Sequence, residues 1–158
     1  MIETERKFLV ADHSYRELAY SCRGIVQGYL CYGGGGNSVR VRIYGEQAFL
    51  TIKGPSGPDG MSRFEWEKEI SVEEARDLMR LCVSGMVDKT RYLVKSGSHV
   101  VEVDEFHGAN AGLVMAEIEL ASPQEQFLRP GFLGKEVTGD VRYYNSYLSE
   151  HPFSTWGE

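Results

Sequence analysis

The sequence predicts an α+β fold that is mainly β, with a closed eight-stranded antiparallel barrel, a charged lumen and short helices packed on the outside. Two observations predict this fold. Apolar and polar residues alternate with a period of two over most of the chain, as they do in strands. The polar positions are mostly charged, and each strand groups its charges by sign. A barrel whose strands turn their charged faces inward would explain both patterns.

Eight segments with this two-residue period are expected as strands. They are residues 2–10, 24–32, 38–44, 47–53, 63–70, 89–95, 99–106 and 113–120. The connections between them contain the glycine, asparagine and proline residues of tight turns. The strands are therefore expected to follow one another as antiparallel hairpins and meanders.

Helical spacing appears in four shorter segments. They are residues 14–20, 71–82, 123–128 and 143–148. The pattern is strongest in the second, where Ser71 and Glu74 have the spacing of a capping box and precede an apolar stripe that includes Ala75 and Leu78. We assign residues 1–150 to one domain and residues 151–158 to a C-terminal tail.

Composition excludes several classes of protein. The chain has 158 residues, the size of one domain, and its 17 basic and 23 acidic residues give a net charge of -6. This sign excludes a protein that coats nucleic acid or an anionic membrane by bulk attraction. Three cysteines without Cys-x-x-Cys spacing, and no apolar run of membrane-spanning length, predict a cytoplasmic protein. Any bound anion must then be held by a local basic cluster.

The grouping of charges by sign indicates a ligand. Arg40 and Arg42 share one face of their strand, whereas Val39 and Val41 share the other. A single strand of this kind usually has one solvated face, but seven strands repeat the grouping, and like charges two residues apart repel each other. Paired carboxylates bind hard divalent cations, and paired arginines or lysines bind phosphate oxygens. The two sets together predict a site for a metal-polyphosphate complex.

The charged pairs lie in an ordered series of short motifs over residues 1–147. They are Glu3-Thr4-Glu5-Arg6-Lys7, Gln27-Gly28-Tyr29-Leu30, Val39-Arg40-Val41-Arg42, Leu50-Thr51-Ile52-Lys53-Gly54, Glu65-Trp66-Glu67, Lys89-Thr90-Arg91-Tyr92, Glu102-Val103-Asp104, Glu117-Ile118-Glu119 and Glu136-Val137-Thr138-Gly139-Asp140. This series resembles the CYTH superfamily of triphosphate tunnel metalloenzymes, in particular its small bacterial inorganic triphosphatases. Those members have Lys-Arg-Tyr after the last motif, whereas this chain has Val141-Arg142-Tyr143. The departure leaves substrate preference open.

The resemblance implies a hydrolase that cleaves inorganic triphosphate or a small organic triphosphate with Mg²⁺ or Mn²⁺. The metal ligands that it implies are Glu3, Glu5, Glu117 and Glu119, with Glu65, Glu67, Glu102 and Asp104 holding a second metal or orienting a water molecule. The residues that it implies for phosphate binding are Arg40, Arg42, Lys53, Lys89, Arg91 and Arg142. The charge spacing independently allows these assignments.

Lys7 and Tyr29 are the candidate catalytic residues. Lys7 would act as a general base if surrounding cations favour its neutral form and Tyr29 reaches it inside the lumen. The alternative is that Lys7 only binds phosphate.

Two other functions are open at this stage. One is a class IV adenylate cyclase that makes cyclic AMP from ATP, although the chain offers no recognisable adenine-binding motif. The other is a non-catalytic protein that binds polyphosphate or a nucleotide, although such a protein needs no cluster of eight acids around its anion. We expect a small-molecule triphosphate as the substrate, with no nucleic acid and no membrane as partners, and leave a homodimer open.

Overall fold

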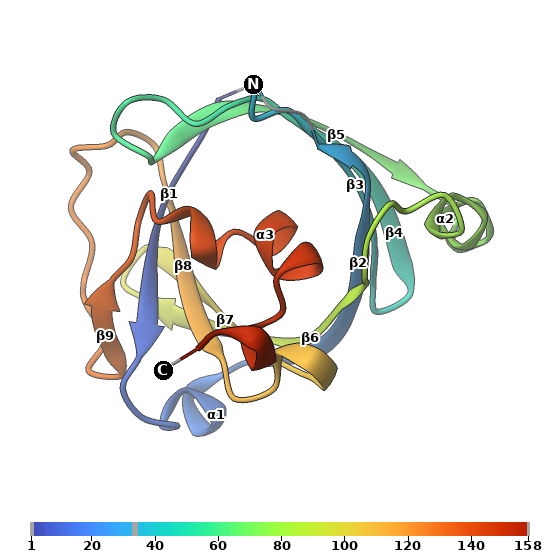
Figure 1. Ribbon diagram of the computed structural model, residues 1–158. Coiled ribbons are helices and arrows are strands. Elements are labelled where there is room, and N and C mark those ends of the chain that lie inside the picture. Colours follow the sequence, from blue (N-terminus) through green and yellow to red (C-terminus); the bar gives the residue numbers. More distant parts are fainter. Residues whose placement is uncertain (1, 33–34, 158) are drawn as a thin grey trace.

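The main element of the protein is an antiparallel β-barrel. The computed structural model describes residues 2–32 and 35–157. The strands are β1 (Ile2–Val10), β2 (Ser21–Tyr32), β3 (Ser38–Tyr44), β4 (Gln47–Lys53), β5 (Ser62–Ile70), β6 (Val87–Ser96), β7 (His99–Phe106), β8 (Val114–Leu120) and β9 (Leu133–Glu136). They pair in the order β5-β4-β3-β2-β6-β7-β8-β1-β9, and a further pairing of β5 with β1 closes the first eight into a ring (Figure 1). The predicted eight-stranded barrel is confirmed.

The ninth strand was not predicted. β9 has four residues and pairs with the end of β1, where Val10 lies opposite Leu133. The backbone N–H of Val137 also donates to the carbonyl of Lys7 at 2.8 Å. A strand this short has no detectable alternation, so its position depends on the edge that β1 leaves free beyond its pairing with β5.

One predicted helix is absent from the described part of the chain. The α-helices are α1 (Tyr15–Leu18), α2 (Val72–Met79) and α3 (Asn145–Glu150). The helix predicted over residues 123–128 is wrong, because this segment is held by other bonds: Glu125 accepts from the backbone of Ala121, and Ser96 donates to the carbonyl of Leu128. A helix of six residues has little intrinsic stability against such contacts. None of the helices in the described part of the chain is long and apolar enough to cross a membrane.

The outer face of the barrel is apolar and is covered by short segments. Phe8, Val103 and Ile118 form a buried cluster with Tyr15 of α1 and with Phe132. On another side, α2 packs Ala75 against β3 and β4. The predicted capping box of α2 is present, since Ser71 and Glu74 exchange backbone to side-chain hydrogen bonds of 3.0 Å. This arrangement confirms that α1 and α2 lie on the outside.

The inner face of the barrel is apolar at one end only. Val87 has the same inward parity as Lys89 of β6, and Met115 the same inward parity as Glu117 of β8, and both pack with Phe106 and with Leu148 of α3. Viewed along the barrel, α3 therefore lies within the ring of strands and not outside it (Figure 1). Residues predicted as a tail continue this packing, because Phe153 and Trp156 contact the same cluster. The C-terminal segment thus fills one end of the barrel and leaves the charged part of the lumen next to it.

Candidate active site

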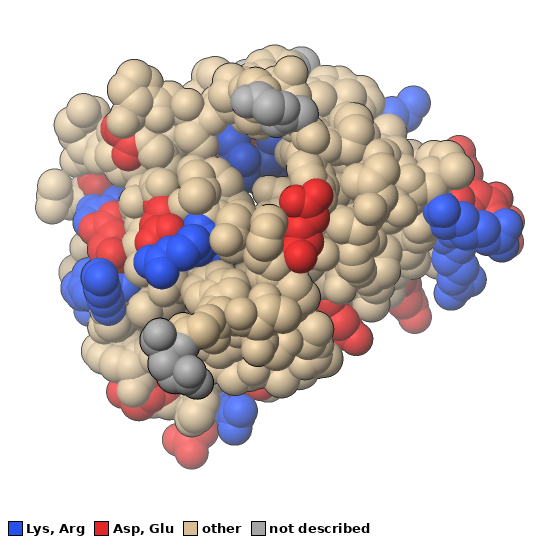
Figure 2. Space-filling view, viewed as in Figure 1, with Lys and Arg blue, Asp and Glu red and all other residues tan. Residues whose placement is uncertain are grey.

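The charged side chains converge on one cavity inside the barrel. It encloses about 200 Å³. The residues that line it are Glu3, Glu5, Lys7, Tyr29, Ser38, Arg40, Arg42, Lys53, Arg63, Glu65, Glu67, Lys89, Arg91, Glu102, Glu117, Glu119, Tyr144, Asn145 and Ser146. Figure 2 shows Lys and Arg atoms at the bottom of a hollow in the surface, which is a view into the molecule from one end of the barrel. Strand alternation alone explains most of this set, since seven acids and seven cations point inward from seven of the eight barrel strands.

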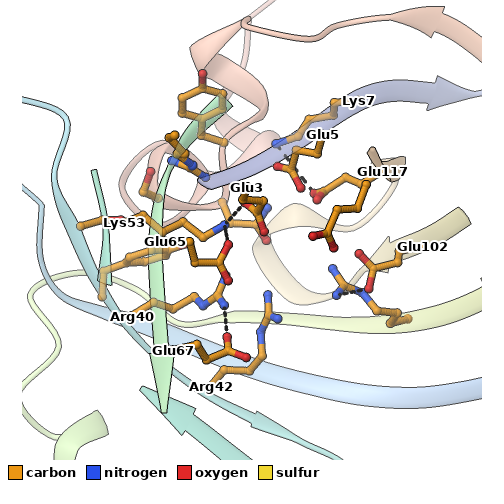
Figure 3. Close-up of a pocket in the computed structure, with 18 of the residues that line it drawn as sticks. Glu3, Glu5, Lys7, Arg40, Arg42, Lys53, Glu65, Glu67, Glu102 and Glu117 are labelled. Atoms are coloured by element: carbon orange, nitrogen blue, oxygen red, sulfur yellow. Dashed lines mark hydrogen bonds and ion pairs between the residues drawn. The ribbon is translucent and has the colours of Figure 1, made fainter. Parts of the chain in front are cut away.

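Strand register decides which charges become neighbours. Across β1 and β8, Glu5 lies opposite Glu119 and Lys7 opposite Glu117. Across β4 and β5, Lys53 lies opposite Glu65. Acids of β1 and β8 therefore face one another on one side of the cavity, whereas the arginines of β3 reach in from the other side (Figure 3).

A buried ion cluster anchors the basic side. Asp104 accepts two hydrogen bonds from Arg91, of 2.8 and 2.9 Å, and lies 2.7 Å from the ammonium of Lys89. Burial acts to raise the pKa of Asp104, but Arg91 and Lys89 outweigh it and lower this pKa to about 2. Lys89 also donates to Asn145 of α3 at 2.8 Å. Two cavity cations are thus fixed by an acid that lies behind them.

Arg42 is different, because its one described hydrogen bond goes to a neutral partner. Its Nε donates to Gln27 at 2.9 Å, and no carboxylate among residues 2–32 and 35–157 lies within ion-pair distance of it. Burial, with the like charges of Arg40 and Arg91, lowers the pKa of Arg42 to about 9. The guanidinium is still charged at neutral pH, and its charge is left for a ligand to balance.

The pKa values of two neighbouring carboxyl groups on the acidic side are shifted in opposite directions. Burial, followed by the neighbouring charge of Glu117, raises the pKa of Glu5 to about 8. Burial acts in the same direction on Glu117, but Lys7 and a hydrogen bond from Glu5 hold the pKa of Glu117 well below its ordinary value. Glu5 is therefore the protonated donor and Glu117 the ionised acceptor at neutral pH. Burial raises the pKa of Glu119 as well, with Glu3 adding to the effect.

The remaining acids pair with cations across the cavity. Lys53 lies 2.9 Å from Glu3 and 3.6 Å from Glu65. Arg40 lies 3.4 Å from Glu67, which also accepts from the hydroxyl of Thr51 at 2.8 Å. These contacts leave two buried atoms without a hydrogen-bond partner, the Nε of Arg40 and the Oε2 of Glu65. A donor and an acceptor are thus available to a ligand.

The acidic set fits a divalent cation only after rearrangement. In the described part of the chain, no three Asp, Glu, His or Cys side chains are grouped closely enough to hold a metal ion as they stand. The donors are nevertheless the carboxylate oxygens that Mg²⁺ and Mn²⁺ prefer. Two neighbouring carboxyls, the protonated Glu5 and the ionised Glu117, offer the place where a cation would displace a proton.

All but two of the residues that the sequence placed in the site line the cavity. The metal assignment of Asp104 is corrected, because its carboxylate is 2% exposed and is occupied by Lys89 and Arg91. The phosphate assignment of Arg142 is also corrected, because this exposed side chain pairs with Asp140 at 2.7 Å and lies outside the cavity lining.

The surroundings expected for Lys7 and Tyr29 also differ. Lys7 has acidic and aromatic neighbours: its ammonium lies 3.8 Å from Glu117, donates to the carbonyl of Tyr143 at 3.2 Å, and lies over the ring of Tyr144. The described hydrogen-bond partner of the Tyr29 hydroxyl is Gln27, at 3.3 Å. The cationic surroundings assumed for Lys7 as a base are therefore absent from its described contacts.

Sequence reasoning missed several lining residues. Arg63 shares the inward parity of Glu65 and Glu67, so the strand pattern could have identified it. Tyr144 and Asn145 come from the segment that enters α3, where no alternation marks a side chain as inward-facing.

The chain is similar to known proteins over most of its length. The family model described as CYTH domain matches residues 1–144. An inorganic triphosphatase of Acetivibrio thermocellus is 42% identical over 159 residues, which cover 99% of this chain and 98% of that protein. An inorganic triphosphatase of Nitrosomonas europaea is 37% identical over 153 residues, with 94% and 97% covered. The crystal structure of the inorganic triphosphatase NE1496 matches with a TM-score of 0.65 and 34% identity, over 93% of this chain and 97% of that one.

Asp104→Asn should destabilise the fold by about 3 to 5 kcal/mol, because it leaves Lys89 and Arg91 buried without their counter-charge. Denaturant unfolding measures this change. The matched control is Glu102→Gln, which removes the negative charge that pairs with the same Arg91 on a side chain that is 34% exposed, and should cost about 1 kcal/mol or less. Equal losses in the two variants would contradict the anchoring role of Asp104.

Glu5→Gln should change how stability depends on pH. The folded-state pKa of Glu5, about 8, lies above the ordinary value of 4.5, so folding favours the protonated form and wild-type stability falls as pH rises from 4.5 to 8. Glutamine does not titrate, so the variant lacks this contribution of Glu5 to the pH dependence of stability. Because the carboxyl keeps some access to solvent, the stability of the variant relative to wild type should rise by about 1 kcal/mol between pH 6 and 8.5.

The measurement is urea unfolding in EDTA at a series of pH values. Glu46→Gln, in the exposed turn between β3 and β4, is the control and should show the wild-type pH dependence. A constant difference between Glu5→Gln and wild type would argue against the raised pKa of Glu5.

Proposed function

The chain belongs to the CYTH domain family, and from this premise we propose that it is a metal-dependent hydrolase of triphosphates whose substrate is inorganic triphosphate. The observation that carries the proposal is the pair of cavity cations without an acidic partner. Among the described residues, Arg42 and Arg63 line the cavity and form no ion pair. Guanidinium groups match phosphate oxygens in geometry as well as charge, so they identify the ligand as a phosphate-rich anion.

The charge balance of the cavity supports metal dependence. Seven cations and seven acids line it, and Asp104 lies behind two of the cations, so even with Glu5 protonated the site carries no surplus positive charge for a ligand with about four negative charges. A cation that binds with the substrate restores the balance. Glu5, Glu117 and Glu119 would hold it, and Mg²⁺ or Mn²⁺ is the expected ion because all the donors are oxygen atoms. When bound, such an ion neutralises charge that develops on the phosphate oxygens.

Hydrolysis of a phosphoanhydride depends mainly on positioning and on charge stabilisation. Arg42 is oriented for this task by a polar chain, since its partner Gln27 in turn donates to Tyr29 and to Asn145 at 3.3 Å each. We therefore assign Tyr29 a positioning role, in which it acts on Arg42 through Gln27. Lys7 is assigned to phosphate contact, which was the alternative to its role as a base, because its described neighbours are acceptors and not cations.

Cavity size favours the inorganic substrate over a nucleotide. The charged cavity encloses about 200 Å³, below the ~300–1,000 Å³ of pockets for larger organic ligands. Its lining carries charged and hydroxyl groups, with Tyr29 and Tyr144 as the aromatic members. An adenylate cyclase would need a nucleoside to bind in the same space as its triphosphate.

The cytoplasmic location and the homodimer stay predictions.

The decisive experiment measures orthophosphate and cyclic AMP released from inorganic triphosphate, ATP and other organic triphosphates, with Mg²⁺, with Mn²⁺ and with EDTA. We expect orthophosphate from inorganic triphosphate with either metal, no turnover in EDTA and no cyclic AMP. Turnover that persists in EDTA would end the metal-dependent proposal, and cyclic AMP as the main product would favour the cyclase.

Arg42→Ala should raise the KM for inorganic triphosphate by about 10- to 100-fold and change kcat less, because this residue contacts phosphate in the ground state and in the transition state alike. Steady-state kinetics at saturating metal separate the two constants. Arg76→Ala removes an exposed guanidinium from α2 and should leave both constants unchanged. If Arg42→Ala lowers kcat and leaves KM alone, Arg42 acts only in the transition state.

A further inference from the structure

Three hollows of the protein meet at the side chain of Tyr144. Tyr144 lines the charged cavity, a narrow cleft next to Glu5 and Lys7, and a separate pocket of about 350 Å³. Among the described residues, Tyr144 and Arg63 are the two that line all three hollows. Ser38, Arg63, Tyr144 and Ser146 line both the charged cavity and the larger pocket, and the ring of Tyr144 is the aromatic part of this boundary.

Contacts from separate parts of the chain hold this ring in place. The Lys7 ammonium of β1 lies 5.0 Å from the ring centre, and the Arg63 guanidinium of β5 lies 5.4 Å from it. The hydroxyl of Tyr144 forms a hydrogen bond of 3.0 Å with Ser56, in the connection between β4 and β5. Its backbone is fixed as well, because its N–H donates to Val141 and its carbonyl accepts from Leu148 in α3. The ring is thus a tethered wall between the hollows.

The pocket behind the ring has different chemistry from the charged cavity. Its lining combines Tyr32, Tyr147 and Val141 with the polar side chains of Asn37 and Glu150. Aromatic and aliphatic surface beside polar groups is suited to a heterocyclic base and its sugar, whereas a bare polyphosphate can use only the polar groups, such as the Arg63 guanidinium that this pocket shares with the charged cavity. The two hollows side by side have the chemistry needed for the two halves of a nucleoside triphosphate, but Tyr144 stands between them.

We propose that Tyr144 is a specificity-determining residue that confines the substrate to unsubstituted triphosphate by separating the phosphate cavity from the adjoining pocket. Removal of its ring joins the two spaces, so that the phosphates of a nucleoside triphosphate occupy the charged cavity while its base and sugar occupy the pocket. This inference rests on the proposed function of the same cavity. It goes further by naming the residue that decides between two substrate classes and by assigning a ligand class to the second pocket.

The test compares inorganic triphosphate with ATP on wild type, Tyr144→Ala, Tyr144→Phe and Ser56→Ala. Tyr144→Ala should raise the ratio of kcat/KM for ATP to that for inorganic triphosphate by about tenfold or more, mainly through a lower KM for ATP. Tyr144→Phe and Ser56→Ala remove the tether but keep the ring, so each should raise the ratio by about threefold or less. Leu81→Ala removes an exposed apolar side chain that lines none of the three hollows and should leave the ratio at its wild-type value.

Calorimetric binding of both ligands in the presence of metal provides a readout that does not require turnover, and unfolding curves show whether each variant is folded. If wild type cleaves inorganic triphosphate and Tyr144→Ala leaves both the kinetic and the binding ratios unchanged, the partition is refuted and the proposed function stands. Tyr144→Phe with the same large effect as Tyr144→Ala would also refute it, because the ring would then not be the barrier. If wild type neither binds nor cleaves inorganic triphosphate, the proposed function and this inference fail together.

Discussion

The barrel carries its charges on the inside, and this constraint shapes the rest of the structure. An ion moved away from water costs several kcal/mol unless partners compensate it, so each lumen charge needs a neighbour of opposite sign or a bound ligand. Asp104 supplies that neighbour for Lys89 and Arg91. Arg42 has no such neighbour among residues 2–32 and 35–157, and there the cavity is left with a charge that an anion can balance. The same need to balance a buried charge therefore produces the internal ion pairs at Asp104 and the anion-binding group at Arg42.

Inward charges leave the outer face of the strands apolar, and the protein must cover that face. Three short elements do so: α1 brings Tyr15 against the outer cluster, α2 brings Ala75, and β9 adds Leu133 beside β1. These segments contribute no side chain to the lumen, yet they let eight strands with charged inner faces exist as a folded barrel. Their burial of apolar area offsets part of the cost of the ion pairs inside.

The apolar end of the lumen links packing to the site. Leu148 anchors α3 among inward-facing apolar residues, and this places Asn145 at the start of the helix within reach of Lys89 and Gln27. The same turn of chain carries Tyr144 into the space between the charged cavity and its neighbouring pocket. The C-terminal segment thus closes the barrel and also shapes the cavity.

The sequence by itself determined which residues share the lumen, because alternation of side chains along a strand is a local property of the backbone. Glu3, Glu5 and Arg40 were placed correctly for that reason, as was the barrel itself. Only the tertiary structure decided which charges pair. Asp104 follows the inward pattern, but its carboxylate forms ion pairs with Lys89 and Arg91 of β6. These partners are set by the register between β6 and β7, which the sequence of β7 does not determine. Tyr144 and β9 lie in segments without a period, and their positions depend on contacts with residues more than 80 positions away in the chain, such as Ser56 and Phe8.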